Sequence, residues 1–321
     1  MNNEMINIVV CADHRFVMPT GVMMYSLCCN NQNVDIVLHM ICSNSVSDKD
    51  KADLCGVIQK FSGKRILFYD IDENFVEKIP AITNRADITI TAYYRLFLTE
   101  ILPDTINKVL YLDGDVIVRH SLLQLWNLDI SDYPVAAATD CMVAVEPEEF
   151  ERLGYPMSYG YFNSGVCIIN LDYWRKHNCI KDFVDLLDDG DKLRCYDQDV
   201  LNILFHTSKL NFPIKYNLLT VYLYKNPRWS NTMFEHEINE SLQEPVIIHY
   251  AGGDKPWFKK CNPPLSMLFY KYQRLTIWKG IKYDFRPPIK KLSNFIGDKM
   301  REFGLRRKGS SCELRDVSKI V

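Results

Sequence analysis

The sequence has no long hydrophobic run, and none of its apolar stretches approaches the roughly 20 residues that a membrane-spanning helix needs. It also has no internal repeat and no low-complexity segment. The segment from Met1 to Met5 lacks a basic stretch, and the first apolar run stops at Asp13, so we expect no signal peptide. These absences together predict a protein that is made and kept in the cytoplasm.

An excess of charge of either sign is also missing, because 38 Lys and Arg residues face 40 Asp and Glu residues. This balance argues against a broad basic surface, so we expect no nucleic-acid partner. The eleven cysteines are an odd number without a repeated Cys-x-x-Cys frame, and Cys28 and Cys29 are adjacent, which disfavours a bond between them. Because Cys11, Cys42 and Cys167 lie in apolar, strand-like runs, we interpret the cysteines as reduced core thiols.

The chain is long enough for one large α/β domain or two small ones, and strand and helix patterns alternate through its first half. Strands are expected at residues 6–11, 34–42, 65–70 and 108–112, and helices at residues 20–29, 47–61 and 93–101. Ser47 is the expected N-cap of the second helix. This alternation predicts a Rossmann-like, mostly parallel sheet with helices on both faces. Ligands of such sheets bind beyond the carboxyl ends of the strands, where Asp13 and Asp113 fall.

The second half is less regular. Strands are expected at residues 135–139, 165–170 and 246–250, and a short helix is expected to end at Phe205 after a cap at residues 196–199. Residues 146–161 indicate a loop over a site, and residues 211–229 are aromatic and irregular. After Phe285 the pair Pro287-Pro288 breaks the chain. We therefore divide the chain into a catalytic domain, residues 1–285, and a C-terminal tail, residues 286–321.

The tail has the pattern of a basic amphipathic helix. Its apolar residues recur at helical spacing, and they are Leu292, Phe295, Ile296, Met300 and Phe303. Eight Lys or Arg residues surround them, against only Asp298 and Glu302. This pattern predicts peripheral contact with the anionic inner face of a membrane. A solvated helix that packs on the catalytic domain is the alternative.

The most informative segment is Asp113-Gly114-Asp115, which follows an apolar strand. In an extended backbone, residues two apart project to the same side, so the two carboxylates can converge on one cation. Gly114 leaves room for a ligand beside the backbone. Two oxygen ligands suit Mg²⁺ or Mn²⁺, and such ions commonly carry phosphorylated substrates. The segment therefore indicates transfer from a phosphate-bearing donor, with a capped turn as the alternative.

Six segments, in this order, resemble the retaining glycosyltransferases of family 8, which include bacterial lipopolysaccharide galactosyl- and glucosyltransferases and the glycogenins. They are residues 10–13 (VCAD), 91–96 (TAYYRL), 109–115 (VLYLDGD), 161–166 (YFNSGV), 197–202 (DQDVLN) and 249–257 (HYAGGDKPW). The resemblance spans most of the chain. It implies the fold called GT-A, a nucleotide-sugar donor and Mn²⁺.

The resemblance implies that Asp113, Asp115 and His249 bind the metal. This set leaves room for two diphosphate oxygens, and its nitrogen ligand favours Mn²⁺ over the alternative Mg²⁺. Gly252-Gly253 would let the backbone approach phosphate, and Lys255 would neutralise charge on the leaving diphosphate. The alternatives are a core histidine, a turn and a solvated lysine.

The resemblance also implies a set of donor contacts. Asp13 would recognise the nucleotide, and Ala12 would pack near the base, for which uracil is the family expectation. His14 and Arg15 follow where bacterial members often carry an Asn, so base and ribose recognition departs from the family pattern here. The other donor-binding residues implied are Arg95, Asp113, Gly114, Asp140, Asn163, Ser164, Asp197, Gln198, Gly252 and Lys255. Taken alone, Arg95 would be interpreted as a structural ion pair, and the short polar residues as caps or turns.

Retention of configuration needs either a nucleophile beneath the anomeric carbon or a front-face reaction. The catalytic candidates are Arg95, Asp197, Gln198 and Lys255. Gln198 occupies the family position but is a poor nucleophile, so we favour the front-face reaction, with Lys255 assisting departure of the diphosphate. A covalent intermediate on Asp197 is the alternative.

The function indicated is transfer of galactose or glucose from a UDP-hexose to a saccharide or lipid-linked glycan, with lipopolysaccharide or another surface glycan expected by resemblance. The matching acceptor stretch, residues 84–88, does not name the acceptor. A phosphohydrolase of the haloacid dehalogenase type also places an Asp-x-Asp pair after a strand. It expects that pair in the first strand and Thr or Val where this chain has Ile117. A non-catalytic sugar- or nucleotide-binding homologue is the third alternative.

Overall fold

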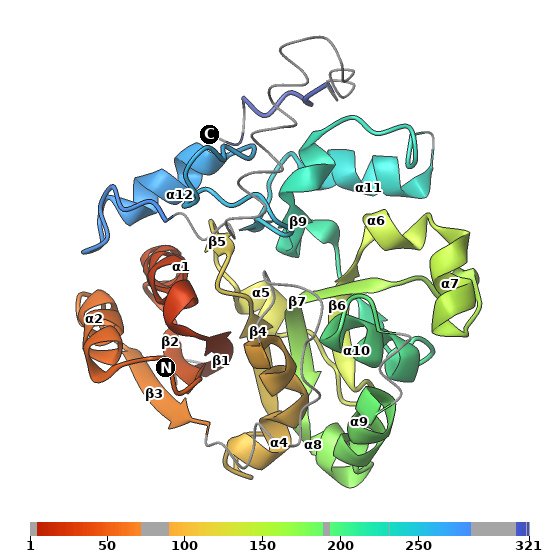
Figure 1. Cartoon of the computed structure of the whole chain (residues 1–321), viewed down its shortest axis with the longest axis horizontal. Helices are drawn as coiled ribbons and strands as arrows, with labels where there is room; N and C mark the ends of the chain where they lie inside the picture. The colour runs from red at the N-terminus through yellow and green to blue at the C-terminus, as the bar shows by residue number, and fades with distance from the viewer. Residues whose placement is uncertain are drawn as a thin grey trace, which may run out of the picture.

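The computed structural model describes residues 5–71, 90–188, 193–230, 232–283, 313–318 and 320. The strands form a seven-stranded sheet of order β3-β2-β1-β4-β7-β6-β8 and a smaller sheet of order β5-β10-β9 (Figure 1). The strands are β1 (Met5–Ala12), β2 (Asp35–Cys42), β3 (Lys64–Asp70), β4 (Lys108–Leu112), β5 (Val116–Val118), β6 (Val135–Thr139), β7 (Phe162–Asn170), β8 (Leu210–Asn211), β9 (Leu218–Leu219) and β10 (Ile247–His249).

The helices pack on both faces of the large sheet. The α-helices are α1 (Val17–Asn30), α2 (Asp48–Ile58), α4 (Leu98–Ile101), α5 (Leu123–Trp126), α6 (Cys141–Ala144), α7 (Pro147–Leu153), α8 (Leu171–Lys176), α9 (Cys179–Asp188), α10 (Asp197–Phe205), α11 (Met233–Ser241) and α12 (Ser266–Gln273). The 3-10 helices are η1 (His14–Phe16), η2 (Ile90–Phe97), η3 (Met157–Tyr159), η5 (Ile214–Tyr216) and η6 (Thr220–Leu223).

Most strand pairs in the large sheet are parallel. β1 lies parallel to β2 and β4, and β2 lies parallel to β3. β7 is the exception, because it runs antiparallel to both β4 and β6. The predicted fold class, a mixed and mostly parallel α/β sheet, is therefore confirmed.

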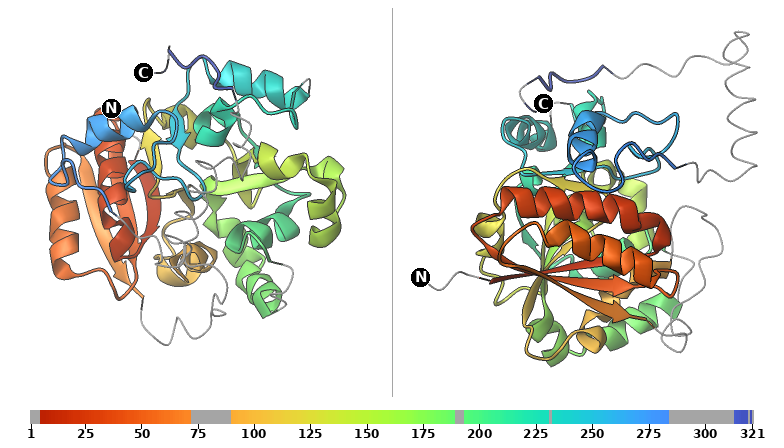
Figure 2. Two further views of the ribbon diagram at one scale, coloured as in Figure 1. Left: turned by 45° about the horizontal axis from the view of Figure 1, so that its top comes forward. Right: turned by 90° about the vertical axis from the view of Figure 1, so that its left-hand side faces the viewer.

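The alternation of side chains along β1 supplies one hydrophobic core on each face of the sheet. Ile8 and Val10 pack with α1, α2 and the small sheet, whereas Val9 packs with η2, α8, α9 and α10. Figure 2 shows the red and orange helices α1 and α2 on one side of the strands, with the green helices α8 and α9 on the other. Each strand of this central region is consequently buried on both faces.

Local signals explain the start of α2. The Ser47 side chain accepts a hydrogen bond from the Asp50 backbone, and the Asp50 side chain accepts one from the Ser47 backbone. This reciprocal pair satisfies two backbone donors that a helix start leaves free. The predicted N-cap at Ser47 is confirmed, and the helix ends at Ile58, three residues before the predicted end.

One expectation about helices was wrong, and another is confirmed with a different helix type. Residues 146–161 were expected to be a loop, but α7 forms there with Pro147 at its first turn and Gly154 in the left-handed conformation after its last. These are ordinary helix boundary residues, so the signal was present. The helix expected at residues 93–101 is a 3-10 helix, η2, followed by the short α4.

The C-terminal end of the chain returns to the catalytic domain. Leu314 forms a β-bridge with Tyr224, and Ile320 is 1% exposed. Residues 286–312 of the predicted tail, which include all of its expected helix, and the predicted acceptor stretch, residues 84–88, lie outside the described residues. Within the parts of the chain that are described, no helix has the length and apolar character needed to cross a membrane.

Candidate active site

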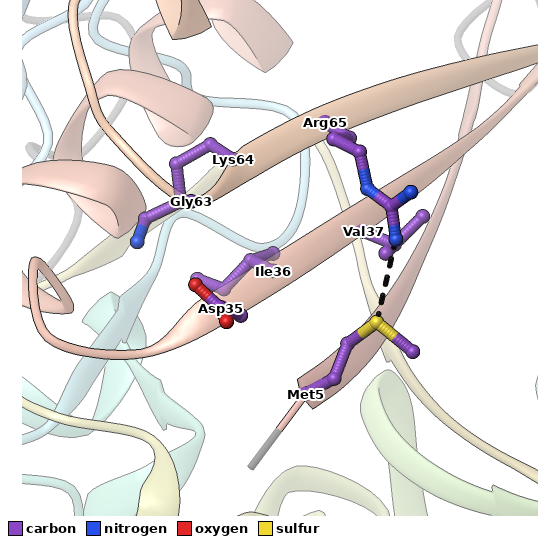
Figure 3. A pocket seen from close by; sticks show the side chains of 7 residues that line it. All are labelled: Met5, Asp35, Ile36, Val37, Gly63, Lys64 and Arg65. Atoms are coloured by element: carbon purple, nitrogen blue, oxygen red, sulfur yellow. Dashed lines mark hydrogen bonds between the residues drawn. The ribbon is translucent and has the colours of Figure 1, made fainter. Parts of the chain in front are cut away.

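The predicted site residues gather at the carboxyl ends of β1 and β4. Asp13 follows β1 directly, and Asp113 follows β4. A separate pocket lies at the opposite, amino ends of β1, β2 and β3 (Figure 3), and its lining residues are Met5, Asp35, Ile36, Val37, Gly63, Lys64 and Arg65. None of these lining residues belongs to the predicted site, in keeping with ligand binding at the carboxyl edge of such sheets.

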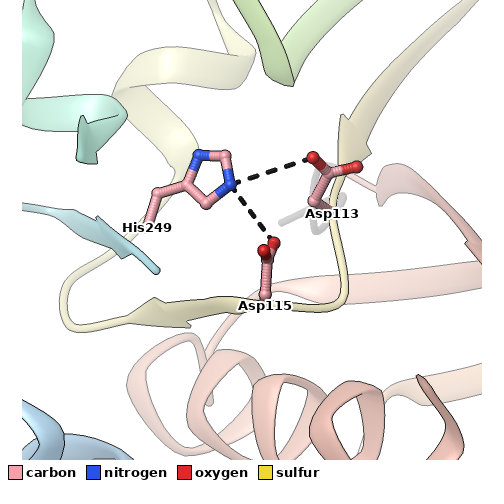
Figure 4. A group of neighbouring side chains, drawn as sticks. All are labelled: Asp113, Asp115 and His249. Carbon is pink, nitrogen blue, oxygen red and sulfur yellow. Dashed lines mark ion pairs between the residues drawn. The ribbon is translucent and has the colours of Figure 1, made fainter. Parts of the chain in front are cut away.

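Asp113, Gly114 and Asp115 form a turn between β4 and β5, not the extended backbone expected from the sequence. The two carboxylates nevertheless converge, because the turn brings the chain back toward β10. One ligand atom from each of Asp113, Asp115 and His249 lies within 4.8 Å of the others (Figure 4). The predicted metal-binding set is thus brought together, by a turn and a second sheet that the strand pattern did not reveal.

His249 presents one particular ring nitrogen to the carboxylates. Its Nε2 lies 3.2 Å from Asp115 Oδ1 and 3.8 Å from Asp113 Oδ2. Its Nδ1 lies 2.9 Å from Asn217 Oδ1, an atom that can only accept a hydrogen bond. The proton is therefore assigned to Nδ1, which leaves the lone pair of Nε2 facing Asp113 and Asp115. Metal-binding histidines are commonly oriented by such a partner.

Asp115 fits a cation ligand in its chemistry and its surroundings. It is 7% exposed, and its Oδ1 is a buried oxygen on which no described hydrogen-bond donor is aligned. Its Oδ2 accepts a hydrogen bond from the ammonium of Lys255. Burial alone would raise the pKa of Asp115, but the positive charge of Lys255 outweighs burial and lowers it. An ionised carboxylate with a free buried oxygen, beside a second carboxylate and an imidazole, suits Mn²⁺ or Mg²⁺.

Arg95 ties two of the predicted site residues together. It is 5% exposed, its Nη2 donates to Asp113 Oδ1 at 2.8 Å, and its Nε lies 3.0 Å from Asp197 Oδ2. Its guanidinium also lies over the Tyr111 ring, 4.1 Å from the centroid. Burial opposes the charge on Arg95, but the two carboxylates raise its pKa well above the usual value. Arg95 therefore forms the buried ion pair that the sequence alone would suggest, and it does so with the predicted site residues.

Asp197 and Gln198, at the start of α10, are both engaged by Ser164. The Ser164 hydroxyl donates to Asp197 Oδ2 at 3.2 Å, and the Ser164 backbone N–H donates to Gln198 Oε1 at 3.0 Å. Burial raises the pKa of Asp197 to about 6, although Arg95 opposes this shift. The predicted catalytic pair is therefore held in one orientation, and the pKa of its carboxyl group lies above the ordinary value for an aspartate.

Asp140 and Asn163 form a second polar layer. Asp140 Oδ2 accepts two hydrogen bonds. One comes from Asn163 Nδ2 at 3.1 Å and the other from Gln198 Nε2 at 3.4 Å. Asp140 also caps α6, because its Oδ1 accepts from Met142 N. Burial raises the pKa of Asp140. Asp140 is therefore the helix cap expected of an isolated aspartate, through Oδ1, and it also contacts the other predicted site residues, through Oδ2.

The nucleotide end of the predicted site is built on η1. Asp13 caps this helix by accepting from Phe16 N at 3.1 Å, and it pairs with Arg15. Ala12 is buried at the end of β1, and His14 Nδ1 lies 2.9 Å from Asp50 Oδ2. The two residues that depart from the family pattern, His14 and Arg15, are thus both paired with carboxylates, those of Asp50 and Asp13.

The glycine pair before Lys255 is exposed, and Gly252 has a φ of 84°. Apart from the adjacent residues, no atom of the described part of the chain lies within 4 Å of a β-carbon built on either glycine. Backbone conformation therefore favours glycine at Gly252, whereas nothing around Gly253 requires it. Lys255 itself is buried against Asp115 and the Tyr250 carbonyl, at 2.7 Å from the latter, so it is not the solvated lysine of the alternative interpretation.

Sequence reasoning missed Asn217 and Asp199. Asn217 is fully buried and joins His249 to Asn163, to which its Nδ2 donates at 2.9 Å. It lies in the irregular residues 211–229, where no periodicity marks it. Asp199 is also fully buried and accepts hydrogen bonds from Arg152, Tyr161 and two backbone N–H groups before α10. Its place within the 197–202 segment was the available signal.

The comparisons with known proteins agree with this arrangement. Residues 7–261 match the model of the family described as glycosyl transferase family 8. General stress protein A of Bacillus subtilis (strain 168) is 30% identical over 284 residues, which cover 87% of this chain and 96% of that protein. A lipopolysaccharide 1,2-glucosyltransferase of Escherichia coli is 29% identical, over 87% of this chain and 81% of the relative.

A solved structure shares the fold. The galactosyltransferase LgtC, in complex with donor and acceptor sugar analogues, superposes with a TM-score of 0.75 at 28% identity, over 85% of this chain and 96% of the other. The predicted GT-A fold is thereby confirmed. The haloacid dehalogenase alternative is excluded, because both the family and the fold are those of glycosyltransferases.

Proposed function

Because the chain belongs to glycosyltransferase family 8, we propose that it transfers a hexose, galactose or glucose, from a UDP-sugar to a glycan acceptor with retention of configuration. The observation that carries this proposal is the convergence of Asp113, Asp115 and His249 beside Lys255. Three such ligands suit a divalent cation, and the adjacent ammonium suits the diphosphate that the cation would share.

The bound cation would offset the negative charge of the departing diphosphate. Lys255 would add a hydrogen-bonding positive charge at the same place, since it is already held among site residues by the Tyr250 carbonyl. Arg95 would offset the charges of Asp113 and Asp197 and fix both side chains in position. Sugar hydroxyls would meet the alternating donors and acceptors of Asp140, Asn163 and Gln198.

The front-face mechanism is the one that the contacts of α10 support. Asp197 Oδ2 is occupied by Arg95 and Ser164, and both ends of the Gln198 amide are hydrogen-bonded. These contacts fix Asp197 Oδ2 and the Gln198 amide in place, an arrangement that suits the support of charge on the reacting sugar. A leaving-group oxygen of the diphosphate would then accept the proton of the acceptor hydroxyl.

The acceptor we propose is lipopolysaccharide or another surface glycan. The support is the activity named for the relatives, which include the Escherichia coli glucosyltransferase and a lipopolysaccharide 1,3-galactosyltransferase of Salmonella typhimurium that is 26% identical. Attachment to the inner face of the membrane would place the enzyme near a lipid-linked acceptor of this kind.

Peripheral membrane contact remains a proposal that rests on the basic tail. The described surface that precedes the tail adds support, since residues 255–283 contain no Asp or Glu. Its exposed cations are Lys259, Lys260, Lys271, Arg274, Lys279 and Lys282, and its exposed apolar residues are Met267, Leu275, Ile277 and Ile281. Cations mixed with exposed apolar side chains favour an anionic lipid surface.

Sedimentation with vesicles tests the membrane proposal. Replacing the eight basic residues between Arg286 and Lys308 by Gln should abolish sedimentation with anionic vesicles and leave donor hydrolysis intact. Truncation is the poorer test, because Leu314 and Ile320 contact the catalytic domain. Unchanged vesicle binding by the Gln variant would refute the proposal.

Release of UDP tests the central proposal. UDP-galactose and UDP-glucose are each incubated with the wild type, with Asp115→Asn and with the exposed control Asp129→Asn, in Mn²⁺ and in chelator. We expect metal-dependent release from one donor in the wild type and the control, reduced at least about a hundredfold in Asp115→Asn. Binding of UDP without release from either donor would contradict the proposed reaction and would indicate an obligatory acceptor, a different sugar or a non-catalytic homologue.

A further inference from the structure

The backbone on both sides of Asp140 is held by one side chain. The Tyr222 hydroxyl, in η6, accepts a hydrogen bond from Cys141 N at 2.9 Å and donates to the Thr139 carbonyl at 3.4 Å. Tyr222 is fully buried, and its ring packs edge-on against Trp229 with centroids 5.8 Å apart. Since Asp140 lies between the two bonded peptide groups, the hydroxyl of Tyr222 restrains the backbone on both sides of Asp140.

The position of Tyr222 depends in turn on the C-terminal end of the chain. Arg315 Nε donates to the Tyr222 carbonyl at 3.1 Å, and Arg315 N donates to the Leu223 carbonyl at 2.7 Å. The far end of its guanidinium lies 2.7 Å from Asn239 Oδ1 and 3.3 Å from Glu235 Oε1, both on α11. Arg315 is 8% exposed, so this is a buried contact and not a surface one.

The neighbours of Arg315 secure the same segment. Lys225 N donates to the Glu313 carbonyl at 2.7 Å, and Leu314 forms a β-bridge with Tyr224. Arg119 Nη2 donates to the Ile320 carbonyl at 2.7 Å. The described C-terminal residues therefore attach to η6, to α11 and to the residue that follows β5.

We propose that Tyr222 and Arg315 are positioning residues for Asp140, so that the C-terminal end of the chain is part of the scaffold of the donor-sugar site. This inference rests on the proposed role of Asp140 in contacting the sugar. Arg315 holds the Tyr222 peptide, the Tyr222 hydroxyl holds the peptides on both sides of Asp140, and the Asp140 carboxylate meets Asn163 and Gln198. A displacement of about 1 Å at such a group is enough to lower turnover strongly.

Two variants test the proposal, with one matched control. Tyr222→Phe keeps the buried ring and removes only the hydroxyl, and Arg315→Ala removes the contact with the Tyr222 carbonyl. Glu313→Gln is the control for Arg315, because Glu313 lies two residues away and its exposed side chain forms an ion pair with Lys225, its one side-chain contact among the described residues. Each protein is assayed well below its own Tm for the affinity of UDP and for kcat and KM with the UDP-hexose, in Mn²⁺.

We expect Tyr222→Phe and Arg315→Ala to lower kcat/KM for the UDP-hexose about tenfold or more while leaving the affinity for UDP unchanged. This split is expected because Asp140 would contact the sugar and not the nucleotide. Asp140→Asn should show the same split, and adding Tyr222→Phe to it should cause little further loss, as for residues that act through one group. Glu313→Gln should match the wild type.

Equal loss of UDP and UDP-hexose binding in both variants would indicate a merely structural role and overturn the proposal. Wild-type kinetics in both variants would do the same. If Asp140→Asn is damaging and Tyr222→Phe is neutral, the positioning inference alone fails. If Asp140→Asn is itself neutral, the proposed contact between Asp140 and the sugar is wrong.

Discussion

The hydroxyl of Thr20, in α1, lies against Gly114 in the space that a β-carbon on Gly114 would need. Thr20 is fully buried, and its hydroxyl has no hydrogen-bond partner among the described residues. Gly114 is not among the glycines with a positive φ, so its backbone conformation is open to other residues. Contact with α1, and not backbone strain, therefore requires glycine between Asp113 and Asp115.

We expect Gly114→Ala to push the turn away from α1 and to weaken Mn²⁺ binding about tenfold or more, because both carboxylates move with the turn. The double variant Gly114→Ala with Thr20→Ala should recover most of that loss, since removing the Thr20 side chain opens the space. Isothermal titration of each variant with Mn²⁺ gives the affinities. A double variant that binds as poorly as Gly114→Ala would contradict this explanation.

Replacing Asn217 by Leu should lower the affinity for Mn²⁺ by about 10- to 100-fold, because His249 loses the acceptor that fixes its proton on Nδ1. The control is Asn170→Ala, which removes another buried asparagine, the N-cap of α8. That control should lower the Tm and leave the metal affinity unchanged. Equal metal affinities for Asn217→Leu and the wild type would remove Asn217 from the site.

The raised pKa of Asp197, about 6, predicts a pH dependence of turnover. If the carboxylate supports positive charge on the reacting sugar, kcat should fall as the pH decreases through about 6. Asp197→Asn should be slower and lack this limb of the profile. A wild-type profile that is flat over about one pH unit on either side of that value would contradict the assignment.

Burial of Asp197 also predicts a change of stability with pH. Its pKa is raised above the ordinary value of 3.8, so its contribution to folding is most favourable below pH 3.8 and is lost as the pH rises through about 6. The Tm of Asp197→Asn minus that of the wild type should therefore increase over this interval and then level off. Thermal unfolding of both proteins across the interval measures the difference.

The front-face mechanism predicts that Gln198→Ala and Asp197→Asn both retain measurable turnover, within about a thousandfold of the wild type. Neither the wild type nor Gln198→Ala should accumulate a hexose-linked protein when incubated with the UDP-hexose. Mass spectrometry of the intact protein and of its peptides provides the measurement. A hexose attached to Asp197 would establish the covalent alternative in place of the proposal.

Much of the fold could be predicted because the relevant signals lie in consecutive residues. The run from Lys108 to Leu112 is apolar and ends at Asp113, and it forms β4 as expected. Ser47 and Asp50 form the capping box because the two residues are three apart. By contrast, β5 and β9 have three and two residues, too few for a periodic pattern to develop. The small sheet that carries His249 to Asp115 could therefore not be predicted.

The sequence by itself determined the residue types of the site and the family, since the six segments preserve their order along the chain. The tertiary structure decided how those residues are held. Asn217 reaches His249 across 32 residues, and Arg315 reaches Tyr222 across 93, and no local pattern encodes either contact. Both contacts arise because buried polar groups must find partners, and which partner lies within reach is set only when the two sheets and the C-terminal segment pack together.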